Sequence, residues 1–321
     1  MKTESGRGWQ LANGDCVEWL ASLPSDSVDY SVFSPPFNSL FAYSDDPRDL
    51  SNCENTEQFF EHFGFVLREL YRVMKPGRIV SQHVMTLPTS KSRDGHVGLY
   101  DFGGDVIRAA EKAGFWFHSK VTIWKCPVVA MTRTKALGLL YKQLIKDSSM
   151  SRQGIPDEIL TFRKPGTNAE PISHRKPGTE LLDVPDAPLP LEHNIDMGGD
   201  VFPVSLWQRW ASPIWDDIDQ GDTLPCRAAK EEDDQKHLCA LQKEVIRRCV
   251  RLWSNRGDTV LTPFAGVGSE LYVSLQEGRK ALGAELKASY WRQAVANLQA
   301  AERRTGDLFA AAPTSVQTAS Y

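Results

Sequence analysis

Two short motifs hold side chains that could do chemistry, and they stand far apart in the chain. The first, Ser34-Pro35-Pro36-Phe37, directly follows the apolar run 28–33. A hydroxyl, two rigid residues and an aromatic ring at the end of a buried strand could clamp a flat ring and accept hydrogen bonds from an amino group on it. Because Ser-Pro-Pro also occurs in ordinary turns, this motif needs support from the rest of the sequence.

The second motif is a glycine loop that follows an expected strand at 259–261. It reads Pro263-Phe264-Ala265-Gly266-Val267-Gly268-Ser269, and the strand after it ends at Glu285. Glycines directly after a strand let a ligand approach the backbone closely, and an acid at the end of the next strand can accept both hydroxyls of a ribose. The third glycine of a dinucleotide loop and the lysine of a phosphate loop are both absent, which disfavours a dinucleotide and ATP. S-adenosylmethionine has no pyrophosphate and suits the shorter loop, and an ordinary glycine turn is the alternative.

The segments around these motifs alternate between expected strands and helices. Helices are predicted at 56–74, 101–113, 236–254 and 271–276, and strands at 28–33, 78–84, 116–125, 159–162 and 281–284. This order predicts an α/β fold with a doubly wound, mostly parallel sheet. Near the N-terminus, Asp15 follows Gly14 at the end of a short strand, where a carboxylate either caps the next helix or meets a ligand.

Charge is distributed unevenly along the 321 residues, although the net charge is only −4. Residues 120–180 hold 11 Lys and Arg against 5 Asp and Glu, whereas residues 181–235 hold 3 against 13. The basic part favours one surface that faces an anion, with a solvated charged face as the alternative. Between about 164 and 236 the periodicity is lost and proline is frequent, but Trp207, Trp210 and Trp215 favour an ordered insert over a linker.

Other classes of protein are disfavoured by composition. No apolar run approaches the roughly 20 residues of a membrane span, and the first residues lack a signal segment, so we expect a cytoplasmic protein without membrane contact. The six cysteines are scattered without metal-ligand spacing, so we expect reduced thiols and no metal.

Taken together, these motifs resemble those of the β-group DNA amino-methyltransferases. Six segments stand in the order of that family: Gly14-Asp15, Ser34–Phe37, Arg72–Gly77, Trp124-Lys125, Pro263–Gly268 and Ala284–Lys287. They cover most of the chain outside 167–235. The resemblance implies a class I, Rossmann-like fold that uses S-adenosylmethionine to methylate the exocyclic amino group of a base flipped out of double-stranded DNA.

The resemblance also implies roles for individual residues and segments. The implied catalytic residues are Ser34, Pro35, Pro36 and Phe37. The implied cofactor-binding residues are Asp15, Pro263, Phe264, Gly266, Gly268, Ser269 and Glu285. The cations expected on DNA are Arg133, Lys135, Lys142, Arg152, Arg175 and Lys176. The implied domains are a catalytic half at 1–166, a target-recognition insert at 167–235, a cofactor half at 236–304 and a flexible tail at 305–321.

The target base is left open by the sequence. A serine at position 34 leans toward cytosine N4 in this family, while adenine N6 is the commoner activity, and we favour adenine. The alternatives are a methyltransferase of RNA or of protein glutamine and a DNA-binding protein with an inactive cofactor site. Aromatic residues in the insert and in the helix at 56–74 could support a homodimer. The recognition sequence and any restriction endonuclease partner are not indicated.

Overall fold

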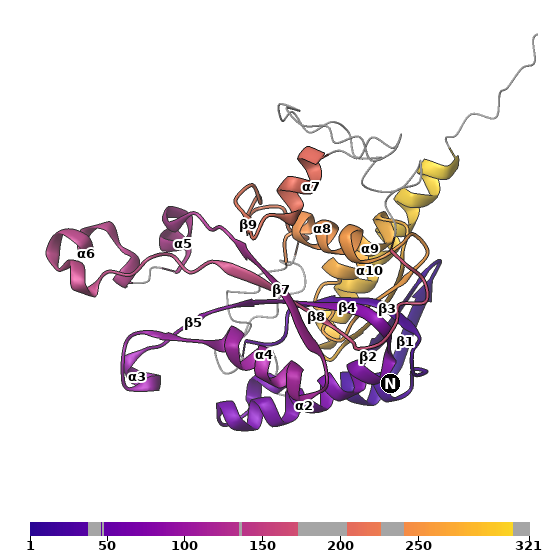
Figure 1. Ribbon diagram of the computed structural model, residues 1–321, viewed down its shortest axis with the longest axis horizontal. Coiled ribbons are helices and arrows are strands. Elements are labelled where there is room, and N and C mark those ends of the chain that lie inside the picture. The colour runs from indigo at the N-terminus through magenta and orange to yellow at the C-terminus, as the bar shows by residue number, and fades with distance from the viewer. Residues whose placement is uncertain (38–45, 47, 135–136, 173–203, 226–240, 311–321) are drawn as a thin grey trace, which may run out of the picture.

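The computed structural model describes residues 1–37, 46, 48–134, 137–172, 204–225 and 241–310. Figure 1 shows a central sheet with helices on both of its faces. The strands are β1 (Lys2–Gly6), β2 (Trp9–Asn13), β3 (Val28–Phe33), β4 (Met74–Met85), β5 (Leu87–Pro88), β6 (Leu99–Tyr100), β7 (Trp116–Ile123), β8 (Asp157–Arg163), β9 (Ile214–Trp215), β10 (Thr259–Thr262) and β11 (Lys280–Glu285). The α-helices are α1 (Cys16–Ala21), α2 (Thr56–Val73), α3 (Lys91–Asp94), α4 (Phe102–Lys112), α5 (Pro127–Thr134), α6 (Tyr141–Lys146), α7 (Val204–Ala211), α8 (Lys243–Trp253), α9 (Ser269–Gln276) and α10 (Ala288–Ala310). Short 3₁₀ turns lie at Leu50–Asn52, Leu137–Leu139 and Ser148–Met150.

The main sheet is mixed, with a parallel centre. Within the described residues its order is β1-β2-β11-β10-β3-β4-β8-β7-β9. The five strands from β2 to β4 are parallel to one another. The pairs β1–β2, β4–β8 and β8–β7 are antiparallel, and β9 is parallel to β7. The predicted doubly wound, mostly parallel sheet is therefore confirmed.

Two layers of helices bury the sheet. Apolar side chains of α8, α9 and α10 pack on one face, and those of α1, α2 and α4 pack on the other. Every residue of β3 is buried, as expected for a parallel strand covered on both sides. Helix α2 shows how the sequence produces this layer. Asn55 caps its first turn, and its buried residues recur at helical spacing up to Val73, just before Pro76 and Gly77 exclude further helix.

Several boundaries differ from those predicted. Helix α8 begins at Lys243, because the Lys243 amide donates to the Asp222 carbonyl and Gln242 is extended. The predicted start at 236 lies outside the described residues. Strands β1 and β9 and helix α7 were not predicted, and the last two lie in the segment 167–235. Helix α10 continues to Ala310, which includes the first residues of the segment predicted as a tail.

One segment extends away from the sheet. Residues 127–156, which connect the antiparallel strands β7 and β8, carry α5 and α6, and Figure 1 shows both helices projecting beyond the body of the molecule. We call this segment the arm. Among the described residues, no helix has the combined length and hydrophobicity needed to cross a membrane.

Candidate active site

The two sequence motifs meet at the carboxyl ends of neighbouring strands. Ser34 follows β3 and Pro263 follows β10, and these strands pair in parallel with Leu261 opposite Ser31. The Ser31 hydroxyl donates to the Leu261 carbonyl at 2.8 Å, which ties the two strands together through a buried bond. Since ligands of open α/β sheets bind outside the carboxyl ends of the strands, this is the expected place for a site.

A cavity of about 740 Å³ lies at this edge of the sheet. Most of the predicted site residues line it, namely Asp15, Ser34, Pro35, Pro36, Phe37, Pro263, Phe264, Gly266, Ser269 and Glu285. Its size is in the usual range for a small-molecule site. Residues from both ends of the chain thus share one cavity.

The glycine loop and Glu285 form one wall of the cavity. Glu285 accepts hydrogen bonds from the Gly266 amide at 2.7 Å and the Lys287 amide at 2.8 Å, which fixes both oxygens of its carboxylate. Burial raises the pKa of Glu285 to about 7, although these two amides act in the opposite direction. Gly266 has a φ of +53°, and a Cβ built on it would meet nothing within 4 Å. An open backbone beside a held carboxylate fits a ligand with a ribose.

Two further buried polar groups lie in this wall. The Ser269 hydroxyl is buried and has no hydrogen-bond partner among the described residues. Glu270 is 5% exposed and lines the cavity, and its pKa is raised to about 8, mainly by burial and also by the nearby Glu285, although a hydrogen bond from its own backbone amide acts in the opposite direction. A buried hydroxyl without a partner is costly, so Ser269 favours a polar ligand in this part of the cavity.

Gly268 has a different place from Gly266. It begins α9 with a φ of +84°, and a Cβ there would lie 3.1 Å from the Cβ of Ala294 in α10. It is not among the residues that line the cavity. The close packing of α9 against α10 is enough to explain why glycine is needed at position 268, and no ligand contact is required.

Asp15 lies at the cavity but has a structural task as well. Its carboxylate accepts hydrogen bonds from the amides of Val17 and Glu18, at 2.8 and 3.0 Å, and so caps α1. The cap holds Asp15 in a fixed position at the rim of the cavity.

The Ser34 loop forms the opposite wall. Pro35 is buried, whereas Ser34 and Phe37 are half-buried. The Phe37 ring packs edge-on against His83 and Phe102, with both centroid separations at 6.2 Å. The Ser34 hydroxyl lies 2.9 Å from His83 Nδ1. The loop is therefore held by contacts with β4 and α4.

His83 introduces residues that sequence reasoning missed. His83 Nε2 lies 3.2 Å from Asp157 Oδ2, and Lys125 Nζ donates to Asp157 Oδ1 at 2.6 Å. Burial alone would raise the pKa of Asp157, but the charges and hydrogen bonds of His83 and Lys125 together lower it below its ordinary value. The available signal was a histidine in the middle of an expected buried strand, where it follows the polar residues Ser81 and Gln82.

The predicted DNA-binding cations lie elsewhere. Lys142 is exposed on α6 and Arg152 is half-buried later in the arm, where burial lowers the pKa of its guanidinium. Arg133 belongs to α5, and Lys135, Arg175 and Lys176 lie outside the described residues. Neither Lys142 nor Arg152 lines the cavity.

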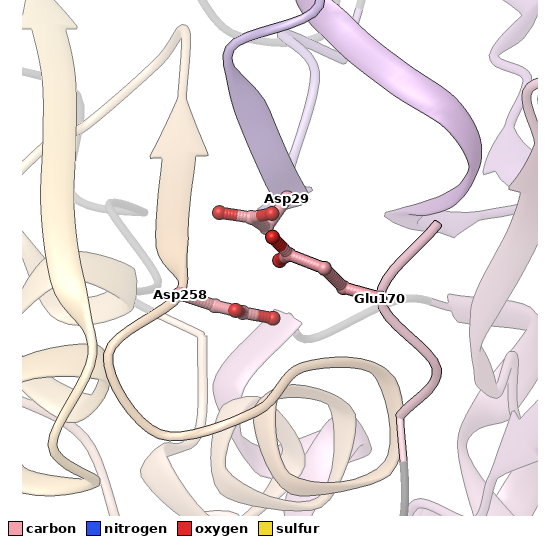
Figure 2. A group of neighbouring side chains, drawn as sticks. All are labelled: Asp29, Glu170 and Asp258. Atoms are coloured by element: carbon pink, nitrogen blue, oxygen red, sulfur yellow. The ribbon is translucent and has the colours of Figure 1, made fainter. Parts of the chain in front are cut away.

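A second polar cluster lies at the other end of the sheet. The carboxylates of Asp29, Glu170 and Asp258 converge there from three segments, with ligand atoms within 4.8 Å of one another (Figure 2). Two cations already neutralise them. Lys75 lies 2.7 Å from Asp29, and Arg78 lies 3.2 Å from Asp29 and 3.0 Å from Asp258. We interpret this cluster as an ion-pair network that joins the amino ends of β3 and β10, not as a metal site.

Comparison with known proteins places residues 28–296 in a family of DNA-modifying enzymes. Residues 28–296 match the family model described as DNA methylase (N6_N4_Mtase). DNA adenine methyltransferase YhdJ of Escherichia coli K12 is 22% identical over 92% of this chain and 85% of its own length. Type II methyltransferase M.MjaI of Methanocaldococcus jannaschii is 31% identical over 70% of this chain and 62% of its own length.

Solved structures give the same picture. A protein of Thermus thermophilus, TTHA0409, is assigned as a DNA modification methylase and was solved in complex with S-adenosyl-L-methionine. It superposes with a TM-score of 0.61 at 25% identity, over 91% of this chain and 93% of that one. The cytosine-N4-specific PvuII DNA methyltransferase shares the fold, with a TM-score of 0.59 at 15% identity, over 94% of this chain and 92% of that one.

Proposed function

Because the chain belongs to the DNA methylase family over residues 28–296, we propose that the loop Ser34–Phe37 binds the exocyclic amino group of a base rotated out of double-stranded DNA. The match to this family model confirms the resemblance seen in the six sequence motifs. The protein is a DNA methyltransferase that depends on S-adenosylmethionine. The observation that carries the proposal is the single cavity lined by both the Ser34 loop and the glycine loop.

The chemistry of the clamp follows from the amino group itself. The lone pair of an exocyclic amino nitrogen is delocalised into the ring, so the nitrogen is a poor nucleophile. If the Ser34 hydroxyl and the Pro35 carbonyl accept its two hydrogens, the lone pair is localised on a more pyramidal nitrogen. Pro35 and Pro36 restrict the backbone that carries this carbonyl, and Phe37 would stack on the ring.

The residues of the wall formed by the glycine loop and Glu285 fit the cofactor. Bound S-adenosylmethionine supplies an electrophilic methyl group on a sulfonium sulfur. Glu285, held by two backbone amides, would accept the ribose hydroxyls, and Gly266 leaves its backbone open to the ligand. Pro263, Phe264 and Ser269 complete this wall, and Asp15 faces the adenine side from the rim. Gly268 would support the loop through its contact with α10.

We take adenine N6 as the target, in keeping with the adenine specificity in the name of the Escherichia coli relative, which matches over 92% of this chain. Cytosine N4 is the second candidate, and it is favoured by the serine at position 34. Methylated plasmid DNA would be digested to nucleosides and analysed by mass spectrometry. N6-methyl-2′-deoxyadenosine supports the first candidate and N4-methyl-2′-deoxycytidine the second. If neither appears, RNA and protein glutamine become the next substrates to test.

Single-turnover kinetics test the clamp. Ser34→Ala should lower the methyl-transfer rate about 10²-fold, the lower end of the range for positioned proton-transfer groups, while cofactor affinity stays nearly unchanged. Ser27→Ala removes a hydroxyl at the amino end of the same strand and should leave the rate unchanged. Equal losses of rate and cofactor affinity in Ser34→Ala would mean that Ser34 supports the fold and not the reaction.

We further propose that the duplex lies against the basic segment. Arg133, Lys135, Lys142, Arg152, Arg175 and Lys176 would contact phosphates, and the segment 167–235 would read the sequence. Replacing Lys142 with Gln should then lower the slope of log affinity against log salt by about one unit. An unchanged slope would remove Lys142 from the interface. A homodimer built on α2 remains a proposal that sedimentation would test.

A further inference from the structure

Beside the Ser34 hydroxyl lies a row of polar side chains that four neighbouring strands, β3, β4, β8 and β7, or the residues just after them contribute. Ser34 Oγ is 2.9 Å from His83 Nδ1, the other ring nitrogen of His83 is 3.2 Å from Asp157, and Asp157 is 2.6 Å from Lys125. His83 and Asp157 are 8% and 2% exposed. They come from β4 and β8, which pair in antiparallel fashion with Asp157 opposite Met85. All four residues line the cavity.

The charges around His83 determine how its ring is protonated. The groups that face it are the Asp157 carboxylate at Nε2, the Ser34 hydroxyl at Nδ1 and the uncharged ring of Phe37, with Lys125 behind Asp157. A carboxylate beside Nε2 favours the tautomer with its proton on Nε2, which leaves Nδ1 to accept the Ser34 O–H. The Nε2 atom is buried, and the Asp157 carboxylate is 3.2 Å away.

We propose that His83 is a positioning residue that orients the Ser34 hydroxyl toward the amino group and receives the proton that methylation releases, with Asp157 stabilising the charged imidazole. The proposal rests on the proposed function of Ser34. With its O–H given to His83, Ser34 Oγ turns its lone pairs toward the amino hydrogens. The arrangement follows the logic of a Ser-His-Asp triad, but here the serine accepts a proton and makes no covalent bond to the substrate.

The proton balance is simple. The amino nitrogen forms its bond to the methyl carbon as the carbon–sulfur bond breaks and leaves its electron pair on sulfur. The nitrogen, now positively charged, passes one proton to Ser34 Oγ while the Ser34 O–H proton moves to His83 Nδ1. The methylated amino group and Ser34 are then neutral, and the imidazolium faces the Asp157 carboxylate until it releases its proton to water.

A double-mutant cycle tests whether His83 acts through Ser34. His83→Gln and Ser34→Ala should each lower the single-turnover rate about 10²-fold, and the double variant should be no more than about threefold slower than Ser34→Ala alone. His118→Gln, at an exposed histidine that also faces a serine, should leave the rate unchanged. Losses that multiply in the double variant would overturn the proposal. If Ser34→Ala is slow and His83→Gln is not, the clamp stands and the relay fails. If Ser34→Ala is fast, the clamp itself fails.

A further measurement separates a relay from a structural role. Nitrogen NMR of the neutral His83 ring should place its single proton on Nε2, beside the Asp157 carboxylate, and Asp157→Asn should weaken that preference and slow the reaction. A proton on Nδ1 in the wild type would refute the relay.

Discussion

Arg78 offers the sharpest test of the forces that hold the two halves of the sheet together. Its guanidinium is 1% exposed and lies between two carboxylates. Asp29 is the second residue of β3, and Asp258 directly precedes β10. In Arg78→Met the two buried carboxylates would lose their shared cation. Asp29 would keep Lys75 and the Thr259 amide, and Asp258 would keep the Asn255 amide. Removing one partner of a buried ion pair typically costs about 3–5 kcal/mol, because a charge is left buried without compensation. The exposed Glu170 should add less than about 1 kcal/mol to this loss.

Urea unfolding would measure the loss. Chains of this length do not always unfold in a single two-state step. Far-UV circular dichroism and tryptophan fluorescence should therefore be compared, and we expect their transitions to coincide. With an unchanged slope, the fall in the midpoint then gives the free energy. As a control, Arg108→Met removes an exposed partner of Asp105 and should leave the midpoint nearly unchanged.

A second substitution identifies the cause of the loss. Adding Asp258→Asn to Arg78→Met removes one uncompensated charge and should recover about 1–2 kcal/mol of the loss. The reasoning fails if Arg78→Met lowers the free energy of unfolding by less than about 1 kcal/mol. It also fails if the loss in the double variant equals the sum of the losses in the two single variants.

Three other predictions concern the cofactor wall. Burial raises the pKa of Glu270 from 4.5 to about 8, so the folded protein holds a proton that the unfolded chain has lost, and stability should fall as pH rises through this range. At pH 8.5, Glu270→Gln should therefore raise the melting temperature by an amount that corresponds to a gain of about 3–5 kcal/mol in the free energy of unfolding. At pH 4.5 it should change the melting temperature little, and equal effects at both pH values would contradict the prediction. Because the pKa of Glu285 is raised to about 7, cofactor affinity measured by calorimetry should weaken as pH falls below 7, and Glu285→Gln should bind weakly and without this dependence. Gly266→Val should reduce cofactor binding more than stability. Gly268→Ala should instead reduce stability, by about 1–2 kcal/mol, because its Cβ would meet α10. Binding assays and thermal melts would measure both effects, and the reverse pattern would mean that the two glycines have exchanged roles.

The main features of the fold and of the cavity were predictable because their signals are local. A glycine directly after a strand and a rigid proline pair keep their meaning whatever the rest of the chain does. Both motifs also follow strands that are buried on both faces, which makes those strands readable as apolar runs.

The residues behind Ser34 were not predictable for the opposite reason. His83 and Asp157 lie on strands that are far apart in the sequence, and they meet because β8 pairs with β4 in antiparallel fashion at one register. Sequence spacing does not encode that register. Gly266 and Gly268 likewise look equivalent in sequence, and only the approach of Ala294 separates a glycine at the cavity from one needed for packing.

The order of strands in the sheet also constrains how the protein is made. Strands β11 and β10 lie between β2 and β3, so the first strands to be synthesised have as neighbours two of the last. Ser31 and its partner carbonyl at Leu261 are 230 residues apart, which corresponds to about 10–50 s of translation. Until then β2 and β3 have open edges, and such edges invite aggregation. A nascent chain that stops before β11 therefore lacks both the closed sheet and the active site, and activity appears only when the sheet is complete.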